Sequence, residues 1–150
     1  ATQISAPLIL VYVVLGGQNT ERFRLVLKVI VAITFVCHGL YAVGYYPQPG
    51  LWVQWCISTF NFADDQMAQS FLKVMGILDF VAAGLLFFHP TFTPAVWYCI
   101  IWGFMTALAR IWSNFYGEFA LNSLHSWGYQ TLFRLVHGGI PLLLWYWSRE

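Results

Sequence analysis

Charged residues are scarce in this chain of 150 residues. Asp, Glu, Lys and Arg make up only 9% of the sequence, whereas an average soluble domain contains about 25%. Hydrophobic residues account for 59% and aromatic residues for 19%. So few charged side chains could not cover a water-facing surface. The composition therefore predicts an integral membrane protein that is surrounded by the lipid bilayer.

The signals of several other functional classes are missing as well. The formal net charge is +1 and no run of basic residues occurs, which argues against nucleic-acid binding. The three cysteines form no CxxC pair, and no HxxH or ExxH spacing is present, so no metal site is expected. No GxSxG motif supports nucleophilic catalysis.

Long apolar segments are abundant. A helix needs about 20 apolar residues to cross a bilayer, and four segments come close to that length: 23–46, 67–88, 94–112 and 128–147. The connections between them are short, which makes neighbouring helices antiparallel. The predicted fold is therefore all-α, a single polytopic membrane domain over residues 1–150 built as an antiparallel four-helix transmembrane bundle.

A fifth apolar run, residues 4–15, is too short to cross the bilayer comfortably. We expect an additional short N-terminal helix that is re-entrant, interfacial or docked on a partner. Whether it crosses the membrane stays open at this stage.

The charge distribution predicts an orientation. Residues 47–66 and 113–127 connect the spans on one side, here named the loop side, and their only charged residues are Asp64, Asp65 and Glu118. The opposite side carries Arg22, Arg24 and Arg149. By the positive-inside rule, both ends of the four-helix unit lie in the cytoplasm, most simply at a bacterial inner membrane.

Five ionisable side chains inside the expected spans are the candidate site. Charges at this depth are costly, so they face a bundle interior, a partner or water. The five are His38, Asp79, Arg110, Arg134 and His137, and all fall in the loop-side half of the membrane. We expect them to line a half-open polar pocket reached from the loop side.

Two further features accompany these residues. Because an unpaired buried charge is costly, Asp79 is expected to pair with Arg134 or Arg110. Small residues let helices approach closely, and the positions expected to do so are Gly39, Gly76, Gly138 and Gly139. An alternative stays open, in which the ion pair and the histidines are purely structural. Tryptophans such as Trp52 and Trp55 are typical of the interfacial belt.

Two stretches resemble a known family. FVCHGLYAVGYY, residues 35–46, and FLKVMGILDFVAAGLLFF, residues 71–88, resemble the first two helices of the DoxX-like membrane proteins. The resemblance extends over residues 22–147 in the order and spacing of helices, although RLVHGGIP, residues 134–141, is more distinctive than the family pattern requires.

The resemblance implies a four-helix membrane bundle. Some relatives are subunits of a thiosulfate:quinone oxidoreductase or partners in redox assemblies, and many have no assigned activity. The positions that match the family pattern are His38, Gly39, Gly76 and Asp79. None is an established catalytic residue there, so no mechanism follows.

Three functions remain after these observations. The first is an accessory subunit that contacts other membrane protein subunits in a larger membrane complex. That complex could be a redox complex. The alternative is a membrane oxidoreductase component that binds a quinone or another lipophilic small molecule in the His/Asp/Arg pocket. The third is a haem protein that uses His38 and His137 as the two axial ligands.

Overall fold

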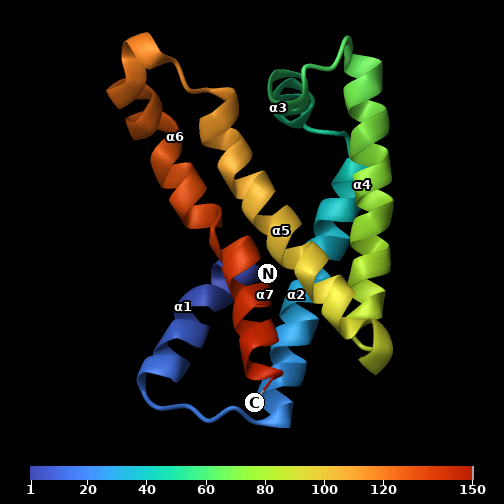
Figure 1. Cartoon of the computed structure of the whole chain (residues 1–150), viewed down its shortest axis with the longest axis vertical. Helices are drawn as coiled ribbons and strands as arrows, with labels where there is room; N and C mark the ends of the chain where they lie inside the picture. Colours follow the sequence, from blue (N-terminus) through green and yellow to red (C-terminus); the bar gives the residue numbers. More distant parts are fainter. Residues whose placement is uncertain (150) are drawn as a thin grey trace.

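The computed structural model describes residues 1–149, and this part of the chain is all-α (Figure 1). The helices in chain order are α1 (Thr2–Val14), α2 (Glu21–Ala42), α3 (Gly50–Phe60), α4 (Asp65–Leu85), α5 (His89–Ser113), the 3₁₀ turn η1 (Gly117–Phe119), α6 (Ala120–Arg134) and α7 (Val136–Trp147).

Three of these helices, α2, α4 and α5, are long and apolar enough to cross a membrane. They correspond to three of the four predicted spans. Side-chain caps fix the starts of the first two. The Thr20 hydroxyl accepts a hydrogen bond from the Phe23 N–H (3.2 Å), and the Asp64 carboxylate accepts one from the Met67 N–H (2.7 Å). Both helices therefore begin two residues earlier than predicted.

Helix α5 begins five residues before the predicted span 94–112. The helix begins at His89, so only residues 86–88 connect α4 to α5. Pro90 fits the first turn, where a backbone N–H has no partner within the helix. Pro94 is accommodated inside the helix at the loss of one backbone hydrogen bond.

The predicted fourth span, 128–147, is wrong as a single helix. The chain forms α6 and α7 with a break at Leu135, and neither piece reaches the length of a span. At the break, the N–H groups of Gly138 and Gly139 both donate to the Leu135 carbonyl, so the Arg134 carbonyl loses its regular partner. Pro141 further weakens this turn because it lacks an N–H group.

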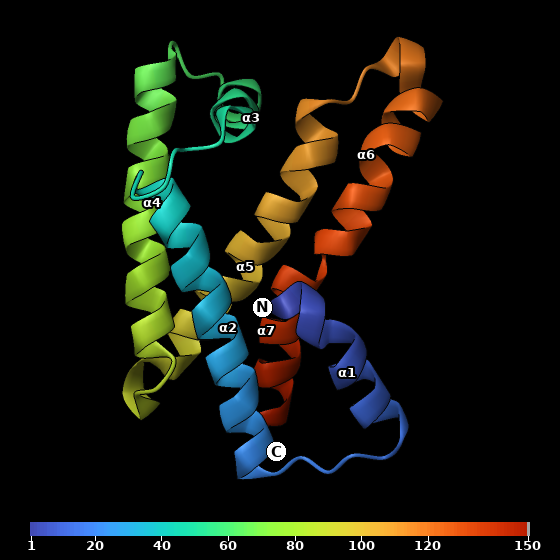
Figure 2. The ribbon, with the colours of Figure 1, turned by 180° about the vertical axis from the view of Figure 1, so that it is seen from behind.

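The helices form two arms that diverge towards the loop side (Figures 1 and 2). One arm consists of α2 and α4, which pack closely where Gly39 and Gly76 face each other. The other consists of α5 and α6. At their common base α5 packs on α7, because Gly103 lets the His137 carbonyl approach its backbone. Gly138 lies against the Phe104 ring, whereas no described atom outside the local helix lies within 4 Å of a Cβ at Gly139.

The short N-terminal run forms α1, as expected. Both ribbon views place α1 beside α7, with the N-terminus near mid-height of the molecule (Figures 1 and 2). Its backbone N–H at Thr2 donates to the Thr34 hydroxyl of α2 (3.2 Å). This end of α1 is therefore buried, with Thr2 held against α2.

One helix occupies residues that were expected to be a connecting loop. Helix α3 ends at Phe60, because the left-handed backbone of the following Asn61 (φ 54°) stops the helix. It contacts α4 and α5, and its Thr59 hydroxyl lies 3.0 Å from the Ser113 hydroxyl. Helix α3 thus lies between α4 and α5 near the open end of the two arms, where Figure 1 shows it end-on.

Candidate functional site

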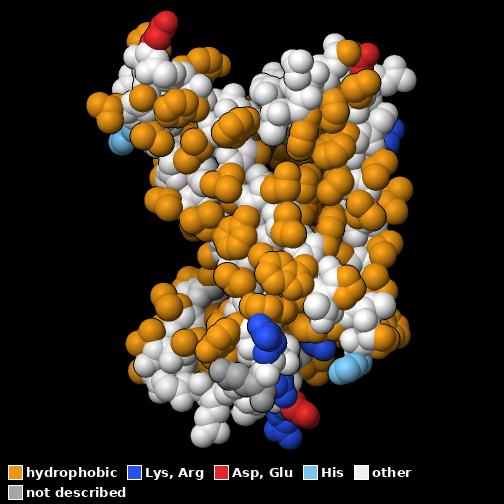
Figure 3. All heavy atoms as spheres, viewed as in Figure 1, with side chains coloured by type: hydrophobic (Ala, Val, Ile, Leu, Met, Phe, Trp, Pro, Cys, Tyr) orange, Lys and Arg blue, Asp and Glu red, His pale blue; other side chains and the backbone are white. Residues whose placement is uncertain are grey.

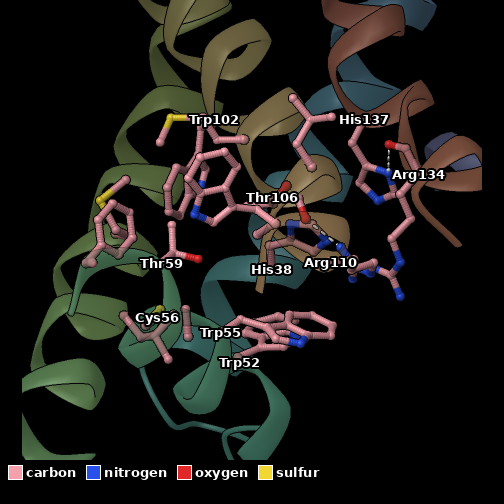
Figure 4. Close-up of a pocket in the computed structure, with 18 of the residues that line it drawn as sticks. His38, Trp52, Trp55, Cys56, Thr59, Trp102, Thr106, Arg110, Arg134 and His137 are labelled. Carbon is pink, nitrogen blue, oxygen red and sulfur yellow. Dashed lines mark hydrogen bonds between the residues drawn. The ribbon is translucent and has the colours of Figure 1, made fainter. Parts of the chain in front are cut away.

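A cavity of about 250 Å³ lies between the two arms, beneath α3 in the orientation of Figure 1; the close-up in Figure 4 shows it with the α3 residues at the bottom. All five candidate residues line it: His38 from α2, Asp79 from α4, Arg110 from α5, and Arg134 and His137 from either side of the α6–α7 break. Residues up to 99 positions apart in the sequence are therefore gathered around one space.

The two histidines lie face to face. The ring centroids of His38 and His137 are 5.1 Å apart with an angle of 15° between the ring planes. The His38 ring also meets the edge of Trp52, with centroids 5.8 Å apart. This stack connects α2, α3 and α7 at one side of the cavity.

His137 also provides a hydrogen-bond partner for a backbone carbonyl at the helix break. Its Nδ1 lies 3.0 Å from the Arg134 carbonyl oxygen, which lost its regular helical partner. A carbonyl oxygen only accepts hydrogen bonds, so Nδ1 carries the proton and donates it to this bond. In the neutral ring, Nε2 then has a free lone pair and can accept a hydrogen bond from a bound molecule.

Two guanidinium groups share the polar side of the cavity. Arg110 is only 4% exposed, with its charge over the Trp55 ring (4.6 Å) and a hydrogen bond from Nη1 to the Thr106 carbonyl. The Arg134 side chain lines the same cavity. Neither arginine forms an ion pair with a carboxylate within residues 1–149. Figure 4 shows both side chains on the same side as the two imidazoles.

The expected ion pair of Asp79 with an arginine is wrong in this structure. Asp79 is 2% exposed, and its Oδ1 accepts a hydrogen bond from the Tyr98 hydroxyl (2.8 Å). Tyr98 precedes Arg110 by 12 residues on α5, which is about 18 Å along the helix. The carboxylate and the Arg110 guanidinium therefore occupy different depths, and the sequence analysis missed Tyr98 as the partner.

The remaining walls of the cavity are mostly apolar and were largely missed. Helix α3 contributes Trp52, Trp55, Cys56 and Thr59. Their spacing of i, i+3, i+4 and i+7 marks one helical face, a signal that was visible in the sequence. The assignment of Trp52 and Trp55 to an interfacial belt overlooked it. Apolar side chains of α4 and α5 complete the walls, among them Leu72, Met75, Trp102 and Met105.

Cys56 is an uncharged part of this wall. The side chain is buried, and this burial raises the pKa of its thiol to about 11. The thiol is therefore protonated near neutral pH and behaves as an apolar lining group.

The site does not fit a haem held by His38 and His137. Two axial imidazoles must point their nitrogen atoms at the iron from opposite sides of the porphyrin plane. Here the rings stack face to face at 5.1 Å, which leaves no layer between them for a macrocycle. Within residues 1–149, no group of three or more His, Cys, Asp and Glu side chains could hold a metal ion.

No family model matches the chain, and neither a curated protein nor a solved structure matches it.

Proposed function

We propose that this protein is an integral membrane protein that binds a lipophilic small molecule in the cavity beneath α3. The observation that carries the proposal is the composition of this one cavity. Two imidazoles and two guanidinium groups line one side, and tryptophan, methionine and leucine line the rest. Small-molecule sites are typically apolar, with a few convergent polar groups that orient the ligand.

The size of the cavity limits what it can hold. Its volume of about 250 Å³ is slightly below the range of roughly 300–1,000 Å³ that is usual for small-molecule sites. It accommodates a compact ring with the first part of a tail, while the rest of a longer tail extends between the arms. A ring with an isoprenoid or alkyl tail, such as a quinone, satisfies both requirements.

The polar groups suit the two redox forms of a quinone. A quinone oxygen accepts hydrogen bonds, and Arg110 and Arg134 supply donors that have no carboxylate partner within the described chain. A quinol hydroxyl donates, and the free Nε2 of neutral His137 accepts. Asp79, held by Tyr98, lies at another wall of the cavity, where a carboxyl group can take up or release a proton.

Equilibrium binding of a short-tailed quinone tests the proposal. Four tryptophans of the purified chain line the cavity, Trp52, Trp55, Trp102 and Trp112, so decyl-benzoquinone should quench their fluorescence saturably. Replacement of His137 by Ala should weaken binding about tenfold or more, because a hydrogen bond to a ligand is worth about 1.5 kcal/mol. The matched control is His125→Ala, an exposed histidine of α6 that does not line the cavity.

Two further measurements make the result decisive. Because His137 also holds the helix break, His38→Ala serves as a second variant that leaves the bond to the Arg134 carbonyl intact. Extraction of the purified protein with organic solvent then identifies any bound native molecule. Unsaturable quenching, or equal affinities of the two cavity variants and the control, would count against a ligand site.

A second candidate function is that of an accessory subunit in a larger membrane complex with redox chemistry. Its support is the apolar flank formed by α1 and α6, which is hollowed on the face shown in Figure 3. Large side chains stand uncovered on both helices, for example Ile4 and Leu121, each 82% exposed. Helix α6 packs mainly on α5, with a further ring contact from Trp127 to Trp55 of α3, so another chain could cover its free side.

Native mass spectrometry after extraction in mild detergent tests this candidate. A subunit should co-purify with another membrane protein, and Leu121→Arg in α6 should release that partner. Leu78→Arg on the lipid-facing side of α4 is the control for a general effect of an exposed charge. A chain that is always recovered alone and unaffected by Leu121→Arg would contradict the subunit role.

The proposed setting is a bacterial inner membrane, with the Arg22 and Arg149 end in the cytoplasm. On the face in Figure 3, most Lys and Arg side chains gather at the lower end, which supports this orientation. Membership of the DoxX-like family stays a proposal that rests on the two matching stretches. In that family setting, α6 and α7 together would take the place of the fourth helix.

A further inference from the structure

A second hollow lies at the opposite end of the molecule from the cavity. It has a volume of about 570 Å³ and is bounded by the start of α2, the turn between α4 and α5, and the end of α7. The charged side chains that line it are Glu21, Arg24, Lys28 and Arg149. Three cations therefore share this space with one carboxylate.

Neutral groups hold all three cations over the hollow. The Lys28 ammonium lies 4.7 Å from the centre of the Phe92 ring, and the Arg149 guanidinium lies 4.9 Å from that of Trp145. Arg24 donates from Nη1 to the Trp147 carbonyl (3.2 Å). Within residues 1–149 none of them forms an ion pair with a carboxylate, so their charges are available to an external anion.

Apolar side chains flank the cations. Leu25 of α2 and Phe87 at the α4–α5 turn line the same hollow and are 54% and 45% exposed. The part of α2 that lines the hollow runs from Glu21 to Lys28, a distance of about 10 Å along the helix. The hollow thus combines three cations with apolar side chains, and it borders α2, a helix long enough to cross a membrane.

We propose that this hollow binds the headgroup of an anionic phospholipid, with the phosphate between Arg24, Lys28 and Arg149 and an acyl chain along Leu25 and Phe87. Basic pockets between transmembrane helices favour such headgroups electrostatically. Leu25 and Phe87 would contribute nothing to the binding of a free phosphate ion, so their presence favours a lipid over a soluble anion. The site does not depend on what occupies the cavity beneath α3.

Competition between two lipids tests this site. The purified full chain is mixed in detergent with equal amounts of phosphatidylglycerol and phosphatidylcholine of the same acyl chains, and bound lipids are counted by native mass spectrometry. We expect phosphatidylglycerol to be preferred, and Lys28→Gln and Arg24→Gln each to lower that preference about fivefold. Arg22→Gln is the matched control, because it removes an exposed cation at the same helix end outside the hollow.

Each outcome bears on the site. Equal binding of the two lipids by the unaltered protein, or an equal loss with Arg22→Gln, would overturn the proposal. Displacement of phosphatidylglycerol by millimolar inorganic phosphate would overturn the lipid in favour of a free anion. Since Arg24→Gln also removes the bond to the Trp147 carbonyl, a folding defect there would leave Lys28→Gln, which breaks no hydrogen bond within residues 1–149, as the deciding variant.

Discussion

His137 combines a structural and a chemical role in one side chain. Its Nδ1–H satisfies the Arg134 carbonyl that the α6–α7 break leaves without a helical partner. The same ring stacks on His38 and lines the cavity. The hydrogen bond at the break therefore fixes one tautomer of the His137 imidazole and leaves Nε2 open to a ligand.

The close approach of α5 and α7 at this point depends on Gly103. A Cβ at this position would lie 2.6 Å from the His137 carbonyl oxygen, and neither backbone can yield easily. Gly103→Ala should therefore lower the free energy of unfolding by about 1–3 kcal/mol, as overpacking does. Thermal unfolding in detergent measures the change.

Gly84→Ala is the matched control, because no described atom outside the local helix backbone lies within 4 Å of its added methyl group. This substitution inside α4 should be neutral or stabilising by about 0.5–1 kcal/mol. Equal unfolding temperatures for the two variants would contradict the assigned close approach.

The thiol of Cys56 provides a pH-dependent probe of the cavity. Its raised pKa of about 11 means that the reactive thiolate is rare at neutral pH and increases with pH up to that value. In a Cys37→Ala, Cys99→Ala background, the rate of maleimide labelling at Cys56 should rise about tenfold for each pH unit between 7 and 10. A rate that levels off near pH 8.5 would indicate an exposed, unshifted thiol.

Helix α3 is the element that closes the cavity from the loop side. It contributes five lining residues, Trp52, Trp55, Cys56, Thr59 and Phe60, and contacts α5 through the Thr59 and Ser113 hydroxyls. A bound molecule of the proposed size must pass α3 or slip between the arms. These two routes make different predictions for a cross-linked α3.

A disulfide between positions 59 and 113 separates the two routes. The hydroxyl oxygens lie 3.0 Å apart, so Thr59→Cys with Ser113→Cys should oxidise readily in a background without the native cysteines. If α3 is the gate, oxidation should slow decyl-benzoquinone binding in stopped-flow fluorescence, and reduction should restore it. An unchanged rate after complete oxidation would assign the route to the gap between the arms.

At the scale of elements, the sequence allowed good predictions where one signal acted alone. Helices α2, α4 and α5 are continuous apolar runs. The caps at Thr20 and Asp64 moved the starts of α2 and α4 by only two residues, and α5 begins five residues early. The α6–α7 break was not predicted, because apolar composition outweighed the combined effect of Gly138, Gly139 and Pro141. Helix α3 was missed because only 11 residues separate Pro49 from Asn61.

The candidate site was predictable in its membership but not in its pairing. Placement in the loop-side half of the expected spans was enough to group the five ionisable residues, and all of them line one cavity. The partner of Asp79 depends on how α4 and α5 are rotated and offset, which no spacing within one helix reveals. Tyr98 therefore took the place expected for an arginine.

At the scale of the whole molecule, charge is separated along the long axis. The acidic residues Asp64, Asp65 and Glu118 lie near the loop-side end, and the hollow at the other end gathers three cations. A membrane protein with this distribution should insert with the cationic end in the cytoplasm. The cavity then opens towards the outer leaflet.

Cysteine accessibility from the two sides of the membrane checks this orientation. In a background without native cysteines, Asp65→Cys should react with an impermeant maleimide in right-side-out vesicles, and Arg22→Cys should react only in inverted vesicles. Both positions are exposed in the structure, so burial does not limit either reaction. The reverse pattern would place the cavity towards the cytoplasmic leaflet.

The claim at the centre of this account is that a tailed, oxygen-bearing ring sits among imidazole and guanidinium groups under the third helix. Photolabelling with an azido-benzoquinone in native membranes, followed by peptide mapping, addresses it most directly. We expect adducts on residues 50–60 and 98–113 that an excess of unlabelled quinone abolishes. Adducts spread over outward-facing surfaces and indifferent to competitor would contradict it.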